Sequence, residues 1–186
     1  NNIAYLERIF ETMDEPVVVG DAPNAETLPD ISGEVEFRDV TFAYEPGIDI
    51  LEHVNLHVRA GESIALVGPT GAGKSTVVNL LCRFYNLNGG SILLTDRDGG
   101  AHDISQVTLH SLRSQLGIML QDSFLFTGRL KENIRYGRLD AADEEIVEAA
   151  RRVRADDFIR DLKDGYDTPV KERGGNLSQG QKQLVA

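Results

Sequence analysis

Long apolar runs, cysteine and positive charge are all scarce in this chain of 186 residues. No stretch approaches the roughly 18 apolar residues of a membrane span, and the N-terminus lacks the regions of a signal peptide. The single cysteine, Cys82, excludes an internal disulfide framework and fits a reducing compartment. With 19 Lys and Arg against 30 Asp and Glu, the formal net charge of -11 argues against a nucleic-acid partner.

A complete phosphate-binding loop stands out among the motifs that are present. The pattern G-x-x-x-x-G-K-[ST] is fitted by Gly68-Pro69-Thr70-Gly71-Ala72-Gly73-Lys74-Ser75-Thr76. It follows an apolar run at 63–67, which predicts a buried strand, and precedes an apolar-faced helix. We expect backbone N–H groups and the helix N-terminus to bind phosphate, Lys74 to reach the β- and γ-phosphates, and Ser75 to ligate Mg²⁺. The alternative is a glycine-rich turn with a solvent-facing lysine.

Strands come early in the chain and helices late, which predicts an α/β fold. An amphipathic helix is expected at 3–13, followed by a linker that ends near residue 32. Strands are expected at 34–42, 51–58, 63–67, 91–94 and 116–120, the first two of them antiparallel. Helices are expected at 129–136, 140–155 and 157–162 and from about 177 onward, with a loop at 164–176.

The segment Asn176-Leu177-Ser178-Gln179-Gly180-Gln181-Lys182-Gln183 resembles the signature motif of ABC (ATP-binding cassette) ATPases. That motif is usually written L-S-G-G-Q, and Gln179 replaces its first glycine. The resemblance implies that Ser178, Gly180 and Gln181 bind the γ-phosphate held by the P-loop of a second, partner domain. A serine-capped helix without a ligand is the alternative.

Two further residues resemble nucleotide contacts of the same family. Tyr44 stands where the family carries an aromatic residue that stacks on adenine, although a lone aromatic at a strand end is more often core. Gln121 stands at the Q-loop position, which implies contacts with Mg²⁺ and the attacking water, while its loop meets the membrane domain. The alternative for Gln121 is a solvent-facing side chain.

The exporter branch of the family is indicated by residues 168–174, which look like the X-loop of ABC exporters. Glu172 would face the coupling helices of a transmembrane domain, or else be an exposed loop carboxylate. Residues 124–126, 132–137 and 7–11 also resemble exporter sequence.

The resemblance implies a P-loop NTPase (RecA-like) core with an antiparallel β subdomain and an inserted helical subdomain. Residues 1–32 would then be a helix and linker from a preceding transmembrane domain, 33–186 a partial nucleotide-binding domain, and about 122–186 its helical subdomain.

The family's Walker B aspartate, catalytic glutamate and switch histidine do not follow the signature in these 186 residues. We therefore expect a fold incomplete at its C-terminus, and a chain that binds ATP weakly at best and does not turn it over. The four histidines show no metal-ligand spacing.

The combined motifs predict the ATP-binding part of an ABC exporter. Two such domains would close head to tail around two MgATP at the cytoplasmic face of a membrane, with Lys74 and Gln121 in catalysis. A soluble ABC ATPase without transport and a non-hydrolysing ATP-binding fragment are the alternatives. The transported substrate is not encoded here, because selectivity belongs to membrane helices.

Overall fold

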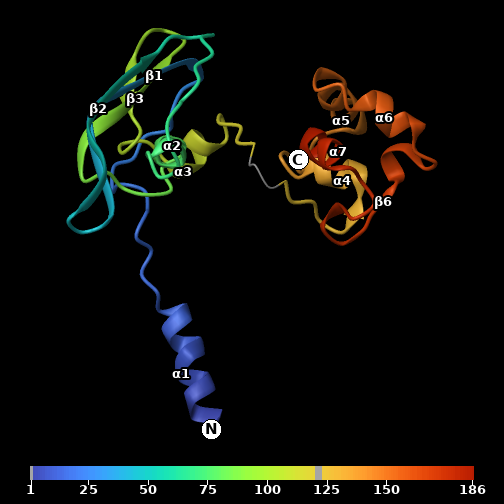
Figure 1. The fold of residues 1–186 in the computed structure, drawn as a ribbon, viewed down its shortest axis with the longest axis horizontal. Coiled ribbons are helices and arrows are strands. Elements are labelled where there is room, and N and C mark those ends of the chain that lie inside the picture. The colour runs from blue at the N-terminus through green and yellow to red at the C-terminus, as the bar shows by residue number, and fades with distance from the viewer. Residues whose placement is uncertain (1, 120–122) are drawn as a thin grey trace. The chain divides into compact units, whose positions relative to one another are not determined.

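The computed structural model describes residues 2–119 and 123–186, which divide into two compact units, Asn1–Gly117 and Ile118–Ala186. The first holds a sheet and the P-loop helix, and the second is mainly helical (Figure 1), so the predicted α/β class is confirmed. The first unit contains α1 (Asn2–Met13), β1 (Ile31–Glu45), β2 (Ile48–Val58), α2 (Lys74–Leu81), β3 (Gly89–Asp96), β4 (Ala101–Asp103) and α3 (Leu109–Arg113). The second contains β5 (Gly128–Arg129), α4 (Leu130–Arg135), α5 (Asp143–Arg152), α6 (Asp156–Asp161), η1 (Gly165–Asp167), β6 (Pro169–Val170), η2 (Glu172–Gly174) and α7 (Gln179–Val185).

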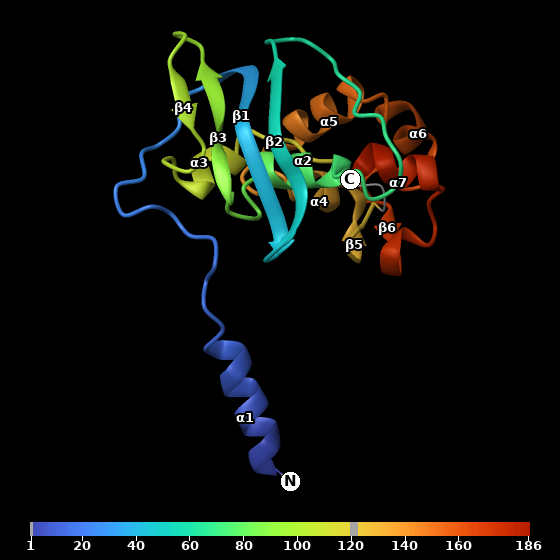
Figure 2. The ribbon, with the colours of Figure 1, turned by 60° about the vertical axis from the view of Figure 1, so that its left-hand side comes forward.

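An antiparallel sheet with the strand order β2-β1-β3-β4 forms most of the first unit (Figure 2). The central strand β1 pairs Phe37 with Leu56 of β2 on one side and with Ile92 of β3 on the other. This confirms the antiparallel strands predicted at 34–42 and 51–58 and the strand at 91–94. The sequence does not predict β4 or α3, because three and five residues are too short to show a period.

The P-loop helix α2 is supported by the apolar side of this sheet. Leu80 of α2, Leu112 of α3, and Ile92 and Leu94 of β3 are all fully buried in one cluster. Cys82, directly after α2, is buried, and this burial raises the pKa of its thiol. The start of α2 is therefore held against a packed core.

The linker between α1 and β1 is attached to the first unit at several points. The buried guanidinium of Arg83 donates to the Gly20 carbonyl at 2.9 Å. Leu28 is 3% exposed and belongs to the core, although the sequence predicts only a linker there. The domain boundary at residue 33 stays a prediction.

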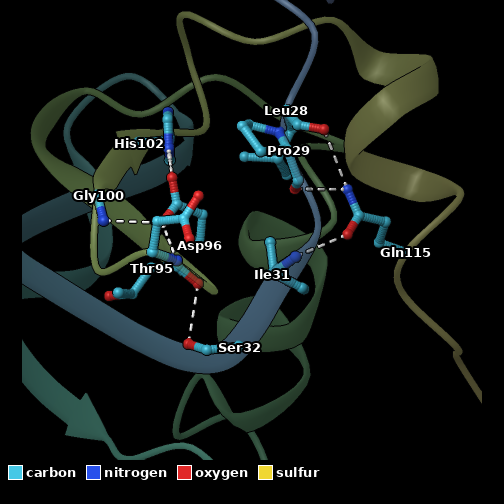
Figure 3. Close-up of polar contacts among 10 residues, drawn as sticks. Leu28, Pro29, Ile31, Ser32, Thr95, Asp96, Gly100, His102 and Gln115 are labelled. Carbon is cyan, nitrogen blue, oxygen red and sulfur yellow. Dashed lines mark hydrogen bonds and ion pairs between the residues drawn. The ribbon is translucent and has the colours of Figure 1, made fainter.

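One side chain of the segment after α3 holds the end of the linker (Figure 3). Gln115 donates from Nε2 to the carbonyls of Leu28 at 3.2 Å and Pro29 at 3.0 Å. Its Oε1 accepts the Ile31 N–H at 2.9 Å, so one amide fixes the chain where it enters β1. Three backbone groups of residues 28–31 thus have a side-chain hydrogen-bond partner.

Two strands predicted from apolar runs, at 63–67 and 116–120, are wrong for the residues that the structure describes. Neither 63–67 nor 116–119 pairs with a strand in the described chain. The side chains of Ile64, Leu66 and Val67 are 45%, 39% and 92% exposed. A strand requires a neighbour for its backbone N–H and C=O groups, and apolar composition alone does not provide one.

The second unit has a separate apolar core. Its four α-helices each bury a residue in the same cluster: Leu130, Ala150, Ile159 and Val185. The predicted helices are confirmed to within three residues at their starts. The helix expected from residue 140 begins at Asp143, where Glu145 accepts the Ala142 N–H at 2.9 Å.

The loop predicted at 164–176 contains β6, which pairs with β5, and two short 3₁₀ turns. A buried carboxylate fixes the start of this region: Asp156 accepts hydrogen bonds from the Tyr166 hydroxyl at 2.7 Å and from Arg160 at 2.9 Å. These hydrogen bonds, led by that of Tyr166, lower the pKa of Asp156, and burial raises the pKa of Tyr166 to about 12. None of the described helices combines the length and the apolar character of a membrane span.

Candidate functional site

The P-loop forms an exposed loop that ends in the first turn of α2. Lys74 folds back over this loop, and its Nζ donates to the carbonyl oxygens of Gly68 at 2.8 Å and Pro69 at 2.7 Å. Gly73 is the N-cap of α2, and among the residues that the structure describes no side chain caps the helix N–H groups there. An ammonium group and free helix N–H groups at one loop are the donors that a phosphate requires.

Glycine is needed at two P-loop positions with a left-handed backbone. Gly71 has φ 87° and Gly73 has φ 79°. At Gly73 a Cβ atom would also lie 2.8 Å from the Leu51 side chain and 3.3 Å from the Ile50 carbonyl oxygen. The loop therefore combines a left-handed backbone, which glycine adopts readily, with a close approach to β2.

Tyr44 lies beside the P-loop helix, near the end of β1. Its hydroxyl is 3.2 Å from Thr76 Oγ1 in the first turn of α2. Tyr44 is 46% exposed, which leaves surface on which a base could stack. The structure thus brings Tyr44 and the P-loop together, while its role toward adenine stays a prediction.

The signature residues cap the last helix. Ser178 Oγ accepts the Gln181 N–H at 3.2 Å, and Gln181 Oε1 accepts the Ser178 N–H at 2.9 Å, which is a reciprocal capping box. Leu177 is 8% exposed and fixes the motif to the core of the second unit. Gly180 is exposed, and a Cβ there would meet nothing within 4 Å. Nothing in the surrounding chain therefore requires glycine at position 180.

The loop that carries Glu172 is closed by an asparagine that sequence reasoning missed. Glu172 is exposed in the short turn η2. Asn176 accepts the Lys171 N–H at 3.0 Å and donates to the Pro169 carbonyl at 3.0 Å. An asparagine within a polar loop is the available signal, since its amide can bond to backbone on both sides.

Gln121 lies outside the described residues, so its predicted contacts stay a prediction. Among the residues that are described, no group of histidine, cysteine and carboxylate side chains has the arrangement of a metal site. Three of the four histidines instead contact single carboxylates. These pairs are His53 with Asp39 at 2.8 Å, His57 with Glu34 at 2.6 Å and His102 with Asp96 at 2.7 Å.

Proteins similar to this chain include ATP-binding proteins of ABC transporters. An uncharacterized ABC transporter ATP-binding protein of Bacillus subtilis, YfiC, is 52% identical over 184 residues, which are 99% of this chain and 30% of that protein. A fatty acid ABC transporter ATP-binding/permease protein of Mycobacterium bovis is 46% identical over 186 residues, which are 100% of this chain and 28% of that protein.

A solved structure of a bacterial Atm1-family ABC exporter with ATP bound has a TM-score of 0.88 and 44% identity. The match covers 98% of this chain and 31% of that one. The chain thus spans about 30% of the length of the curated relatives it matches. A family model described as ABC transporter matches residues 51–186, and on that match the chain belongs to the ABC transporter family.

Proposed function

We propose that this chain is the ATP-binding part of an ABC exporter, which couples ATP binding and hydrolysis to export across a membrane. The carrying observation is the loop before α2, where Lys74 Nζ and free helix N–H groups lie together. The exposed ring of Tyr44 is joined to the same helix at Thr76. One nucleotide could therefore place its phosphates and its base on a single support.

Each part of the nucleotide has an assigned partner in this proposal. The run Gly68–Thr76 binds the phosphates, Tyr44 stacks on adenine, and Lys74 stabilises charge on the γ-phosphate. Ser75 and Gln121 ligate Mg²⁺, and Gln121 also orients the attacking water. Ser75 fits this role because it is an exposed oxygen donor in the first turn of α2. When bound, Mg²⁺ would neutralise negative charge on the nucleotide's phosphates.

The partner in ATP binding would be a second domain of the same kind, joined head to tail. Ser178, Gly180 and Gln181 would contact the γ-phosphate held by the partner's P-loop. Gly180 supports this assignment, because its own chain leaves open space around it. A missing side chain at such a position permits close approach from outside the chain.

A transmembrane domain is the other proposed partner. In α1 the side chains of Tyr5, Leu6, Ile9, Phe10 and Met13 are all more than half exposed. We assign residues 1–32 to the connection from that domain, 33–186 to the nucleotide-binding domain and about 122–186 to its helical subdomain. The loops of Gln121 and Glu172 would meet the coupling helices, which places the chain at the cytoplasmic face of the membrane.

Lys74 provides the test of ATP use. In the full-length protein, Lys74→Ala should abolish ATP-dependent phosphate release, while Lys163→Ala, at an exposed lysine of the second unit, should leave it unchanged. The 186-residue chain by itself should release no phosphate, because it contains neither a Walker B aspartate nor a catalytic glutamate after the signature. Phosphate release by the full-length protein that survives Lys74→Ala would contradict the role of Lys74. Phosphate release by the 186-residue chain that Lys74→Ala stops would contradict its expected inactivity.

The reading frame upstream of Asn1 separates transport from a soluble role. Six apolar spans would support an exporter, and their absence would support an ABC protein that uses ATP-driven closure for other work.

A further inference from the structure

A second tyrosine contacts the ring to which the adenine role is assigned. Tyr85 follows α2, and its ring centroid lies 4.9 Å from that of Tyr44, with the two planes at 86°. The same ring lies 5.7 Å from Phe42. The edge-to-face pair of Tyr85 with Tyr44 is favourable and directional, so the position of Tyr85 restricts that of Tyr44.

The backbone next to Tyr44 is held from the same segment. Asn88 Oδ1 accepts the Ala43 N–H at 2.8 Å, and the Asn88 N–H donates to the Thr41 carbonyl at 3.1 Å. The chain between α2 and β3 therefore contacts both the ring of Tyr44 and the strand that carries it.

Residues at the two ends of the P-loop helix thus both contact Tyr44. Thr76, in the first turn of α2, contacts its hydroxyl, and Tyr85, just beyond the last turn, contacts its ring. A ring that is already oriented loses less conformational freedom when a base stacks on it. The helix that presents the phosphate-binding loop thus also orients the surface for the base.

We propose that Tyr85 is a positioning residue for nucleotide binding. It orients Tyr44 and so sets the affinity for the base, without changing the affinity for the phosphates. This inference rests on the proposed function, because it takes Tyr44 as the ring that stacks on adenine. A tyrosine that merely stabilised the fold would influence phosphate and base binding alike.

The test compares two probes on the full-length protein, MgATP and inorganic tripolyphosphate with Mg²⁺, by calorimetric titration. Tyr85→Ala should weaken ATP binding by about twofold to tenfold and leave tripolyphosphate binding unchanged. Tyr85→Leu, which keeps apolar volume without a ring, should give the same result, whereas Tyr85→Phe should bind ATP as the wild type does. The matched control is Phe84→Ala: Phe84 and Tyr85 are both 43% exposed, but the Phe84 ring packs against Arg113, and its loss should leave both probes unaffected.

Tyr44→Ala separates failure of this inference from failure of the proposed function. Tyr44→Ala should also weaken the binding of ATP and leave that of tripolyphosphate unchanged. The double variant with Tyr85→Ala should bind ATP as weakly as Tyr44→Ala does, because the two substitutions remove one interaction. If Tyr44→Ala weakens ATP and Tyr85→Ala does not, the positioning role is wrong and the adenine role stands. Equal losses for ATP and tripolyphosphate in Tyr85→Ala would likewise overturn it. ATP binding that is unchanged in Tyr44→Ala would overturn both.

Discussion

Gly73 shows how two independent constraints meet at one residue of the P-loop. Its φ of 79° is unfavourable for any residue with a Cβ atom, and its surroundings leave no room for one. Leu51, the nearest side chain, is 6% exposed and packed in the core, so it cannot turn toward solvent. The motif pattern identifies this glycine, but the packing explains why a Cβ atom fits less well at Gly73 than at Gly71.

We expect Gly73→Ala to destabilise the domain more than Gly71→Ala does. Both substitutions place a Cβ on a left-handed backbone, at a cost of about 1–2 kcal/mol. Gly71 has nothing within 4 Å of that Cβ, whereas Gly73 meets Leu51 at 2.8 Å, which adds about 1–3 kcal/mol. Thermal unfolding of the full-length protein should therefore rank wild type, Gly71→Ala and Gly73→Ala in order of falling melting temperature. Equal melting temperatures for the two variants would contradict the steric argument.

The sequence reveals single residues of this site when the chemistry is local. The P-loop is recognisable because its donors lie within nine consecutive residues, and Ser178 because its partner Gln181 is three positions away. Asn88 is not recognisable, since it bonds to Ala43 across 45 positions of sequence. Tyr85 escapes sequence reasoning for the same reason.

A strand predicted from the sequence was confirmed where a second strand pairs with it. Residues 34–42 and 51–58 alternate in polarity and lie on either side of a short turn, so each provides the other's hydrogen bonds. Residues 63–67 are equally apolar, but no strand in the described chain pairs with them. Periodicity reports which segment could be a strand, and pairing decides whether it is one.

The linker is the element whose attachment is most readily tested. Gln115→Ala removes three hydrogen bonds to the linker, to the Leu28 and Pro29 carbonyls and from the Ile31 N–H (Figure 3), and a fourth to the Ser111 carbonyl. Loss of partners for partly buried backbone groups costs about 1–3 kcal/mol, so the segment should open more often. Hydrogen exchange followed by mass spectrometry should show faster exchange in peptides that cover residues 26–32.

A second glutamine provides the control for this experiment. The Gln106 side chain donates only to the exposed hydroxyl of its neighbour Ser105 among the described contacts. Gln106→Ala should therefore leave exchange in the peptides that cover residues 26–32 unchanged. If Gln115→Ala also leaves it unchanged, the apolar contacts of Leu28 hold the linker without the amide.

For the molecule as a whole, the two motifs to which we assign phosphate binding lie in different units, the P-loop in the first and the signature in the second. Each is built from contacts within its own unit, as Lys74 with Gly68 and Ser178 with Gln181 show. Each motif can thus form without the other. In the proposed assembly each would meet the opposite motif of a second domain only when ATP joins them.

Ser178→Arg tests that assembly. The bulk of arginine at the end of α7 should block ATP-driven closure of two domains, while each separate domain binds ATP nearly as before, because its P-loop is untouched. Ser178→Ala is the matched control, since it also removes the cap hydroxyl, worth about 1 kcal/mol, but adds no volume. Closure can be followed in the full-length protein by distances between spin labels, and binding by titration of the isolated domain. The head-to-tail arrangement is wrong if Ser178→Arg closes like the wild type, and a loss of ATP affinity in the isolated variant domain would show that Ser178 acts within its own chain.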